Sequence, residues 1–169
     1  MDVLQAILTR RSIRRFTGQP VSEGDLETLL RAASQAPSAH NRQPWHFIVV
    51  RDKKSLESIA EFHPYAKMLP RAGCGIVVCG DSVLQKCTGF LVADCSAAIQ
   101  NILLAAHGIG LGAVWCGLYP REGLTRPISE LFGLPENIIP VGVVAVGHGD
   151  EQKDPADRYD KSKIHTERW

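Results

Sequence analysis

Residues 91–109 constrain the fold of this chain more than any other stretch. They are rich in alanine and leucine, contain Asp94 as their one acidic residue, and hold no lysine or arginine. Apolar residues at positions 98, 102, 105 and 106 recur at helical spacing, with further apolar residues at 99 and 103 beside them. A helix that is apolar on more than one face has to be buried nearly all round. We therefore expect a core helix that also meets a second subunit.

Four apolar runs predict strands that share this core: residues 46–50, 76–79, 113–117 and 140–146. Near-continuous runs of this kind are typical of strands covered on both faces. Helical patterns at residues 2–9, 22–36, 53–62, 64–72 and 120–132 alternate with the strands. This order predicts an α/β (α+β) fold, a three-layer sandwich with a mixed central sheet flanked by helices. A length of 169 residues fits one domain over residues 1–169.

Local signals mark the ends of two of the helices. Ser22 and Asp25 resemble a capping box, and the helix they open ends before Pro37, because a residue preceding proline avoids the α region. Gly133 is expected to cap the helix that ends at residue 132. Pro127 is expected to interrupt or reset that same helix.

The charge of the chain is nearly balanced, at a formal +1. We therefore expect no nucleic-acid partner, since nucleic-acid-binding domains are usually basic overall. We also expect no membrane span and no signal peptide. The five cysteines are odd in number and form no C-x-x-C pair, which favours reduced thiols in the cytoplasm. The six histidines lack ligand spacing, so no metal site is predicted.

Residues 10–16, Arg-Arg-Ser-Ile-Arg-Arg-Phe, gather four guanidinium groups in one short stretch. If the stretch is extended, its side chains alternate between two faces, so Arg10, Ser12 and Arg14 point the same way. Two guanidinium groups that flank a hydroxyl make a good receptor for a phosphate dianion, because bidentate charge-assisted bonds are strong. The stretch alone leaves two alternatives open, a solvated basic patch and a nucleic-acid contact.

A second polar segment, residues 36–45, contains two prolines and follows the second predicted helix. Its side chains Ser38, Asn41 and Gln43 can each donate or accept hydrogen bonds. A fixed loop of this kind could contact the edge of a planar heterocycle. An ordinary turn between helix and strand is the alternative.

Together these motifs resemble the FMN-dependent nitroreductase family. The arginine-rich stretch is similar to the family's N-terminal flavin-phosphate motif, and residues 36–45 are similar to its second motif. The apolar helix, the glycines at 110 and 112, and the segment from 131 to 143 also match in order. The resemblance covers nearly the whole chain, as a short member of the family.

The resemblance implies an intertwined homodimer with two FMN molecules in the subunit interface. Its phosphate and ribityl ligands would be Arg10, Arg11, Ser12 and Arg14, with Arg158 of the C-terminal arm closing the pocket. Around the isoalloxazine it implies Pro37, Ser38, Asn41 and Gln43, from the other subunit's loop or at the ring edge, and Trp115, Cys116 and Gly117 near N5. Larger members often carry an acidic residue where this chain has Cys116, so only a backbone contact is carried over there.

Residues 150–169 are polar but end in Trp169. A wholly disordered tail rarely needs a terminal tryptophan, so we expect this arm to pack on the partner subunit.

The activity that the resemblance implies is hydride transfer from NADH or NADPH, through N5 of FMN, to a nitroaromatic, quinone or similar small-molecule acceptor. A ping-pong mechanism is expected, with no side-chain acid or base, because the cofactor carries the chemistry. Two alternatives remain open. One is another flavin chemistry on the same scaffold, such as reductive dehalogenation, and the other is a non-enzymatic FMN-binding or electron-carrier dimer.

Overall fold

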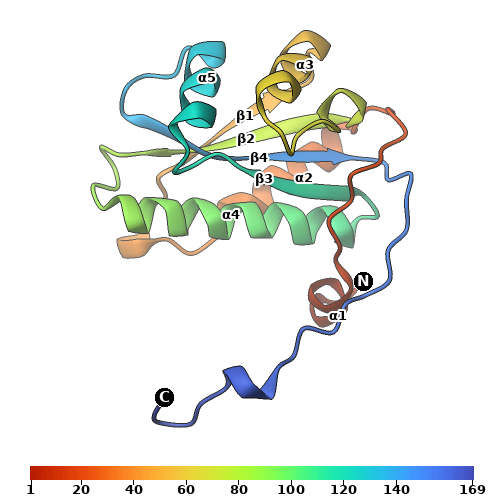
Figure 1. Ribbon diagram of the computed structural model, residues 1–169, viewed down its shortest axis with the longest axis vertical. Helices are drawn as coiled ribbons and strands as arrows, with labels where there is room; N and C mark the ends of the chain where they lie inside the picture. Colours follow the sequence, from red (N-terminus) through yellow and green to blue (C-terminus); the bar gives the residue numbers. More distant parts are fainter.

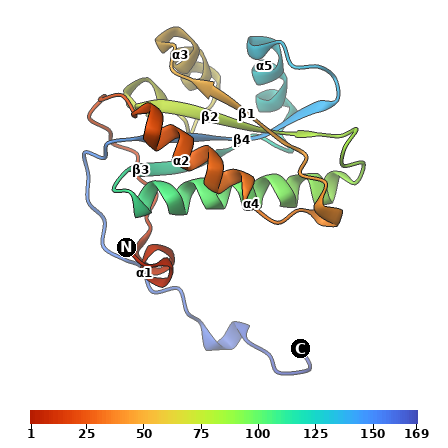
Figure 2. The ribbon, with the colours of Figure 1, turned by 180° about the vertical axis from the view of Figure 1, so that it is seen from behind.

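A four-stranded sheet lies between two layers of helices in the computed structural model, which describes residues 1–169 (Figure 1). Its strands are β1 (Trp45–Val50), β2 (Cys74–Asp81), β3 (Gly112–Gly117) and β4 (Ile138–Gly147), in the order β1-β2-β4-β3. Helices α2 (Glu23–Ser34) and α4 (Thr88–Gly108) cover one face, and α3 (Lys53–Phe62) and α5 (Glu122–Phe132) cover the other (Figures 1 and 2). The short helix α1 (Val3–Thr9) stands below the sandwich. The expected three-layer sandwich is therefore confirmed.

The strand directions differ from the expected mixed sheet. All three neighbouring pairs of strands are antiparallel, and the parallel pairing is an isolated bridge between Ser12 and Ala113. An antiparallel neighbour can follow a helical connection as well as a hairpin, so the spacing of the strands did not determine their direction.

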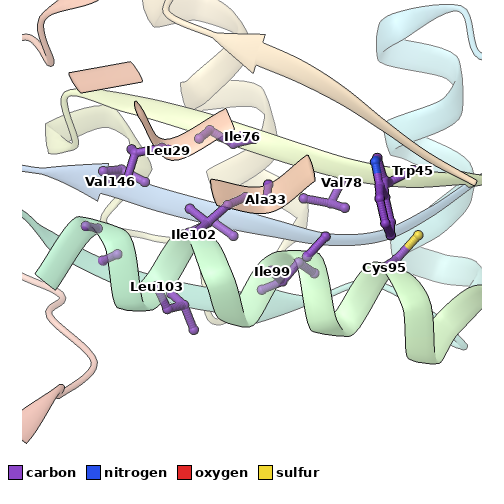
Figure 3. Close-up of a cluster of buried hydrophobic side chains, with 14 of the residues drawn as sticks. Leu29, Ala33, Trp45, Ile76, Val78, Cys95, Ile99, Ile102, Leu103 and Val146 are labelled. Atoms are coloured by element: carbon purple, nitrogen blue, oxygen red, sulfur yellow. The ribbon is translucent and has the colours of Figure 1, made fainter. Parts of the chain in front are cut away.

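The alternation of side chains along each strand divides the core into two clusters. One cluster lies on the face covered by α2 and α4 (Figure 3). There Ile76 and Val78 of β2 and Val144 and Val146 of β4 pack on Leu29, Ala33, Ile99 and Ile102. Toward α3 and α5 point Val77, Cys79, Val143 and Ala145, which pack on Ile59, Leu124 and Ile128. Every strand thus contributes to both helical layers.

The predicted apolar helix is α4, and it is buried on one side only within this protomer. Eight of its 21 residues are buried, and they face α2 and the sheet. Against the expectation that no segment could span a membrane, α4 is long and apolar enough to do so. The core helix of a soluble protein meets the same criterion, and the packing of α4 on the sheet is that of a core helix.

Three of the four local helix signals are confirmed, and one of them is the end of α2 at Ser34, before Pro37. The Ser22 hydroxyl accepts the backbone N–H of Asp25 at 3.0 Å, and Gly133 ends α5 in the left-handed conformation with φ 62°. The expected interruption at Pro127 is wrong, because α5 continues through it. At the sixth position of the helix this proline removes one backbone bond, and the apolar face of α5 still packs on the sheet. Of the expected helix over 64–72, only the 3₁₀ turn Leu69–Arg71 is helical.

The segments near the two ends of the chain are hydrogen-bonded to each other beside the sheet and then diverge. Thr17 donates to the carbonyl of His148, and Asp150 donates to that of Arg15, at 3.0 and 2.8 Å. Beyond these contacts the C-terminal segment passes α1 and leaves the sandwich (Figures 1 and 2). The side chain of Trp169 is fully exposed at its end.

Candidate functional site

The arginine-rich stretch lies along the outer edge of β3. The backbone N–H of Ile13 donates to the carbonyl of Ala113 at 3.0 Å. Gly112 permits this approach, since a Cβ there would lie 2.8 Å from Cγ2 of Ile13. A side chain at position 112 would have to displace Ile13, which explains the glycine at the start of this strand.

The arginine side chains of the stretch have different partners. Arg11 donates to the carbonyl of Asp154, and Nη2 of Arg15 donates to the carbonyl of Asp150 at 3.0 Å. The side chains of Arg10 and Arg14 form no ion pair with an acidic residue. The odd-numbered arginines thus hold the C-terminal segment, and the even-numbered ones are left for another partner.

Glu151 and Lys153 fix the backbone of this stretch. The carboxylate of Glu151 accepts the N–H of Arg14 at 2.5 Å and the ammonium of Lys153 at 3.0 Å. The bond from the Arg14 backbone, with a further contribution from Lys153, holds the pKa of Glu151 below its ordinary value. Lys153 also donates to the carbonyl of Ser12 at 2.8 Å.

A hollow of about 420 Å³, here called the arginine hollow, opens between α1, the end of α4 and the C-terminal segment. Its polar lining includes Arg10, Arg11, His107 and Lys153. Nη1 of Arg10 is buried there without a hydrogen-bond partner. Burial, and then the positive charges of Arg158 and Arg11, lower the pKa of Arg10. A partly buried guanidinium beside like charges is unfavourable, and an anion in this hollow would compensate for it.

A second hollow of about 510 Å³ lies at the other end of β3, and we call it the tyrosine hollow. It brings together Arg14, Trp115, Cys116 and Gly117 with the turn at residues 64–68. Apolar side chains of Tyr65, Met68 and Val114 face it alongside the polar groups, so its lining suits a flat ring system.

Gly117 presents its backbone to the open edge of the sheet. Its carbonyl accepts a hydrogen bond from Nε2 of the buried His63 at 3.0 Å. The N–H and C=O of one strand residue point to the same side, so the Gly117 N–H also faces away from β4. Gly117 therefore offers a backbone donor at the open edge of the sheet.

Cys116 is a neutral hydrogen-bond donor in this hollow. Burial raises the pKa of its thiol to about 11, and the charge of Arg14 offsets only part of this effect. The thiol donates to the carbonyl of Tyr65 at 3.1 Å. A protonated, buried thiol is a poor nucleophile, so the structure indicates packing and positioning for Cys116 rather than redox chemistry.

The indole of Trp115 points to the opposite face of the sheet from its neighbours Val114 and Cys116. It lies over Gly142 of β4, whose missing side chain leaves the space that the ring fills. Trp115 thus reaches the tyrosine hollow from the face that α4 covers.

The loop between α2 and β1 is held by bonds within itself and to α4. The hydroxyl of Ser38 accepts the N–H of Gln43, and the Gln43 amide donates to Oδ1 of Asn41, both at 2.9 Å. Asp94 of α4 accepts the N–H of Ala39 at 2.9 Å. Three residues have left-handed backbones, His40, Asn41 and Gln43, with φ of 55°, 53° and 48°. Such conformations cost about 1–3 kcal/mol each and cluster at binding sites.

Within one protomer, this loop and the arginine-rich stretch are far apart. The loop is bonded to α4 at Asp94. Thr9, directly before the arginine-rich stretch, meets α4 at His107, whose Nε2 is 2.7 Å from the Thr9 hydroxyl. The intervening turns of helix correspond to about 20 Å, and Figures 1 and 2 show the two segments at opposite ends of α4. Pro37, Ser38, Asn41 and Gln43 are therefore not brought to either hollow by their own chain.

Four residues of the site were not predicted from the sequence: His63, Tyr65, Glu151 and Lys153. Their partners lie 51 to 141 residues away along the chain. No local spacing carries a signal of such contacts. The terminal position of the polar segment 150–169 was the nearest indication for Glu151 and Lys153.

Comparisons with known proteins find similar sequences and similar folds. A sequence model described as the nitroreductase family matches residues 7–73 and 64–148. A relative from Methanothermobacter thermautotrophicus, provisionally named an NADH dehydrogenase/NAD(P)H nitroreductase, is 50% identical over 100% of this chain and 88% of its own. A solved structure from Parabacteroides distasonis with the same provisional name has a TM-score of 0.96 and 40% identity, over 99% of this chain and 98% of its own. An FMN-dependent nitroreductase from Clostridium difficile has a TM-score of 0.91 and 27% identity, over 98% and 99% of the two chains.

Proposed function

The chain belongs to the nitroreductase family, and from that premise we propose that it is a homodimeric FMN-dependent oxidoreductase. It takes hydride from NADH or NADPH and passes it to a nitroaromatic, quinone or similar small acceptor. The names of its relatives support the two halves of this statement, the nicotinamide donor and the FMN cofactor.

The buried, unpartnered Nη1 of Arg10 is the observation that carries the proposal. A phosphate dianion bound by Arg10, Ser12 and Arg158 would give this nitrogen an acceptor and neutralise the surrounding positive charge. One terminal phosphate meets this need, which favours FMN over a dinucleotide. Arg11 serves indirectly, by holding the C-terminal segment through the carbonyl of Asp154.

The tyrosine hollow would hold the isoalloxazine ring of FMN. When bound, FMN provides the hydride chemistry at N5 of its ring. The Gly117 N–H faces that end of the hollow, Arg14 adds positive charge, and Tyr65 and Met68 exclude water from one side. No side chain has to act as an acid or base, which agrees with the neutral thiol of Cys116.

A second subunit completes the site in this proposal. It contributes the loop with Pro37, Ser38, Asn41 and Gln43, which one protomer leaves far from its own hollows. The apolar residues Val3, Leu4, Ile7 and Leu8 of α1 are 49 to 73% exposed. A large exposed apolar surface of this kind marks an interface. The arm that ends in Trp169 would wrap over the partner.

The compartment proposed is the cytoplasm. All five cysteines are free, and four of them are buried. Thiols stay reduced in that compartment.

The experiment that tests this function is steady-state turnover of the purified protein with NADH and with NADPH against a panel of nitroaromatics and quinones. Light scattering on the same sample measures its mass. Turnover by a flavin-loaded dimer is expected. A flavin-loaded protein without turnover would support an electron carrier instead, and a stable flavin-loaded monomer would contradict the shared site.

A further inference from the structure

His63 is fully buried between α3 and β3, and both of its ring nitrogens are hydrogen-bonded. Nδ1 lies 3.2 Å from the backbone nitrogen of Tyr65, and Nε2 lies 3.0 Å from the carbonyl oxygen of Gly117. A backbone N–H can only donate and a carbonyl can only accept. The ring is therefore neutral, with its proton on Nε2.

A second bond ties the same turn to the same strand. The thiol of Cys116 donates to the carbonyl of Tyr65 at 3.1 Å. Both backbone groups of Tyr65 are thus held by the end of β3, one directly and one through His63. The ring of Tyr65 packs edge-on against the imidazole, with the centroids 6.4 Å apart, and remains 66% exposed at the tyrosine hollow.

Gly117 needs such a partner because nothing else restrains it on its open side. A Cβ at this position would meet no atom within 4 Å. Glycine has the widest conformational freedom of any residue, so the peptide group between Gly117 and Leu118 is oriented mainly by the hydrogen bonds that it makes. On the inner side, the N–H of Leu118 is bonded to the carbonyl of Val141 at 3.0 Å. On the outer side, the bond comes from His63.

We propose that His63 is a positioning residue, which sets the Gly117 backbone and the Tyr65 ring relative to each other on two walls of the tyrosine hollow. This inference rests on the proposed function, because those walls would hold the flavin ring and the reactant stacked on it. His63 touches neither one. It acts by fixing the geometry in which hydride is transferred, and small displacements in such geometry are costly.

Three variants test the inference on the flavin-loaded protein. His63→Ala removes both bonds. His63→Gln replaces the imidazole by an amide whose nitrogen can reach the Gly117 carbonyl. Gln85→Ala is the matched control, because Gln85 is also buried and bonds a backbone N–H, that of Cys87, outside both hollows.

The measurements are the rate of flavin reduction by NAD(P)H under anaerobic conditions, the flavin absorption spectrum, the FMN dissociation constant and the melting temperature. For His63→Ala we expect the reduction rate to fall by about a hundredfold, with a shifted flavin spectrum and an FMN affinity close to wild type. His63→Gln should recover most of the rate. Gln85→Ala should lower the melting temperature while it leaves rate and spectrum unchanged.

Several outcomes would overturn the inference. One is a His63→Ala protein that folds and keeps the wild-type rate and spectrum. Another is a loss of rate in Gln85→Ala equal to that in His63→Ala, which would show a general effect of destabilisation. If His63→Ala does not fold, the ring nitrogen shifts of His63 in the wild-type protein decide, since a proton on Nδ1 would contradict the assigned bonds. A wild-type protein that takes up no FMN would overturn the proposed function itself, and this inference with it.

Discussion

The carboxylate of Glu151 accepts the backbone N–H of Arg14 at 2.5 Å, across 137 residues of sequence. This bond joins the start of the C-terminal arm to the arginine-rich stretch, and Lys153 strengthens it from the other side. The arm therefore has a role within its own chain, beside the contact with a partner that we propose. Its first residues hold in place the segment that we assign to the cofactor phosphate.

Glu151→Gln is expected to destabilise the protein by about 1 kcal/mol, because a neutral amide forms weaker bonds to the Arg14 N–H and to Lys153. The pKa of Glu151 is lower in the folded state than its ordinary value of 4.5. Its stabilising contribution is therefore complete above that value and is lost as the pH falls through the lowered pKa. Melting curves of wild type and variant should converge in acid and separate toward neutral pH. A constant difference between them over the whole range would contradict this account.

Arg10→Ala is expected to weaken FMN binding by about 10- to 100-fold, the usual effect of removing one charged donor from a buried anion. Arg15→Ala is the matched control from the same stretch, because its guanidinium already donates to the carbonyl of Asp150. Isothermal titration of the two apoproteins with FMN measures the difference. Equal losses for the two variants would show that the faces of the stretch do not differ as described.

Cys116 is expected to resist alkylation in the folded protein. Its thiol has a raised pKa of about 11 and stays protonated below that pH, whereas the exposed Cys87 is accessible. Mass spectrometry after brief treatment with iodoacetamide at mildly alkaline pH should find Cys87 modified and Cys116 unmodified. Rapid labelling of Cys116 would contradict this prediction and would indicate a reactive thiol that could have a redox role.

Ping-pong kinetics are expected, with nicotinamide and acceptor using the tyrosine hollow in turn. Hydride transfer needs the donor carbon stacked about 3–3.5 Å from the ring nitrogen, and anything already stacked there blocks it. Double-reciprocal plots against NAD(P)H should be parallel at several acceptor concentrations, and high acceptor should compete with the nicotinamide. Converging lines would mean that both reactants bind together.

The parts of the fold that depend on local chemistry were predictable from the sequence. Ser22 and Gly133 end helices where expected, and the low charge of residues 91–109 marked α4 as the central helix. Strand direction was not predictable, because it is decided by pairing between segments distant in sequence. Pro127 was misread because tertiary packing of α5 outweighs the loss of one backbone bond.

For the site, residue types indicated the arginine-rich stretch, and the family resemblance indicated Gly117. The contacts that support these residues could not be predicted from the sequence. His63 carried no signal because its role depends on a bond to a residue 54 positions away. The distance between Asn41 and the two hollows was equally hidden. This distance is known only from the structure, in which the length of α4 separates the loop from the arginine-rich stretch.

An anaerobic reduction of the purified protein tests the central claim most directly. One sample is heated to release its cofactor, and the released flavin is identified by chromatography. A second sample is titrated under anaerobic conditions with NADH and with NADPH while the visible spectrum is recorded. The account predicts a yellow protein that releases FMN, one per chain, and whose flavin band is bleached by at least one of the two nicotinamides. A colourless protein that takes up no added FMN, or a flavin that neither nicotinamide reduces, would contradict it.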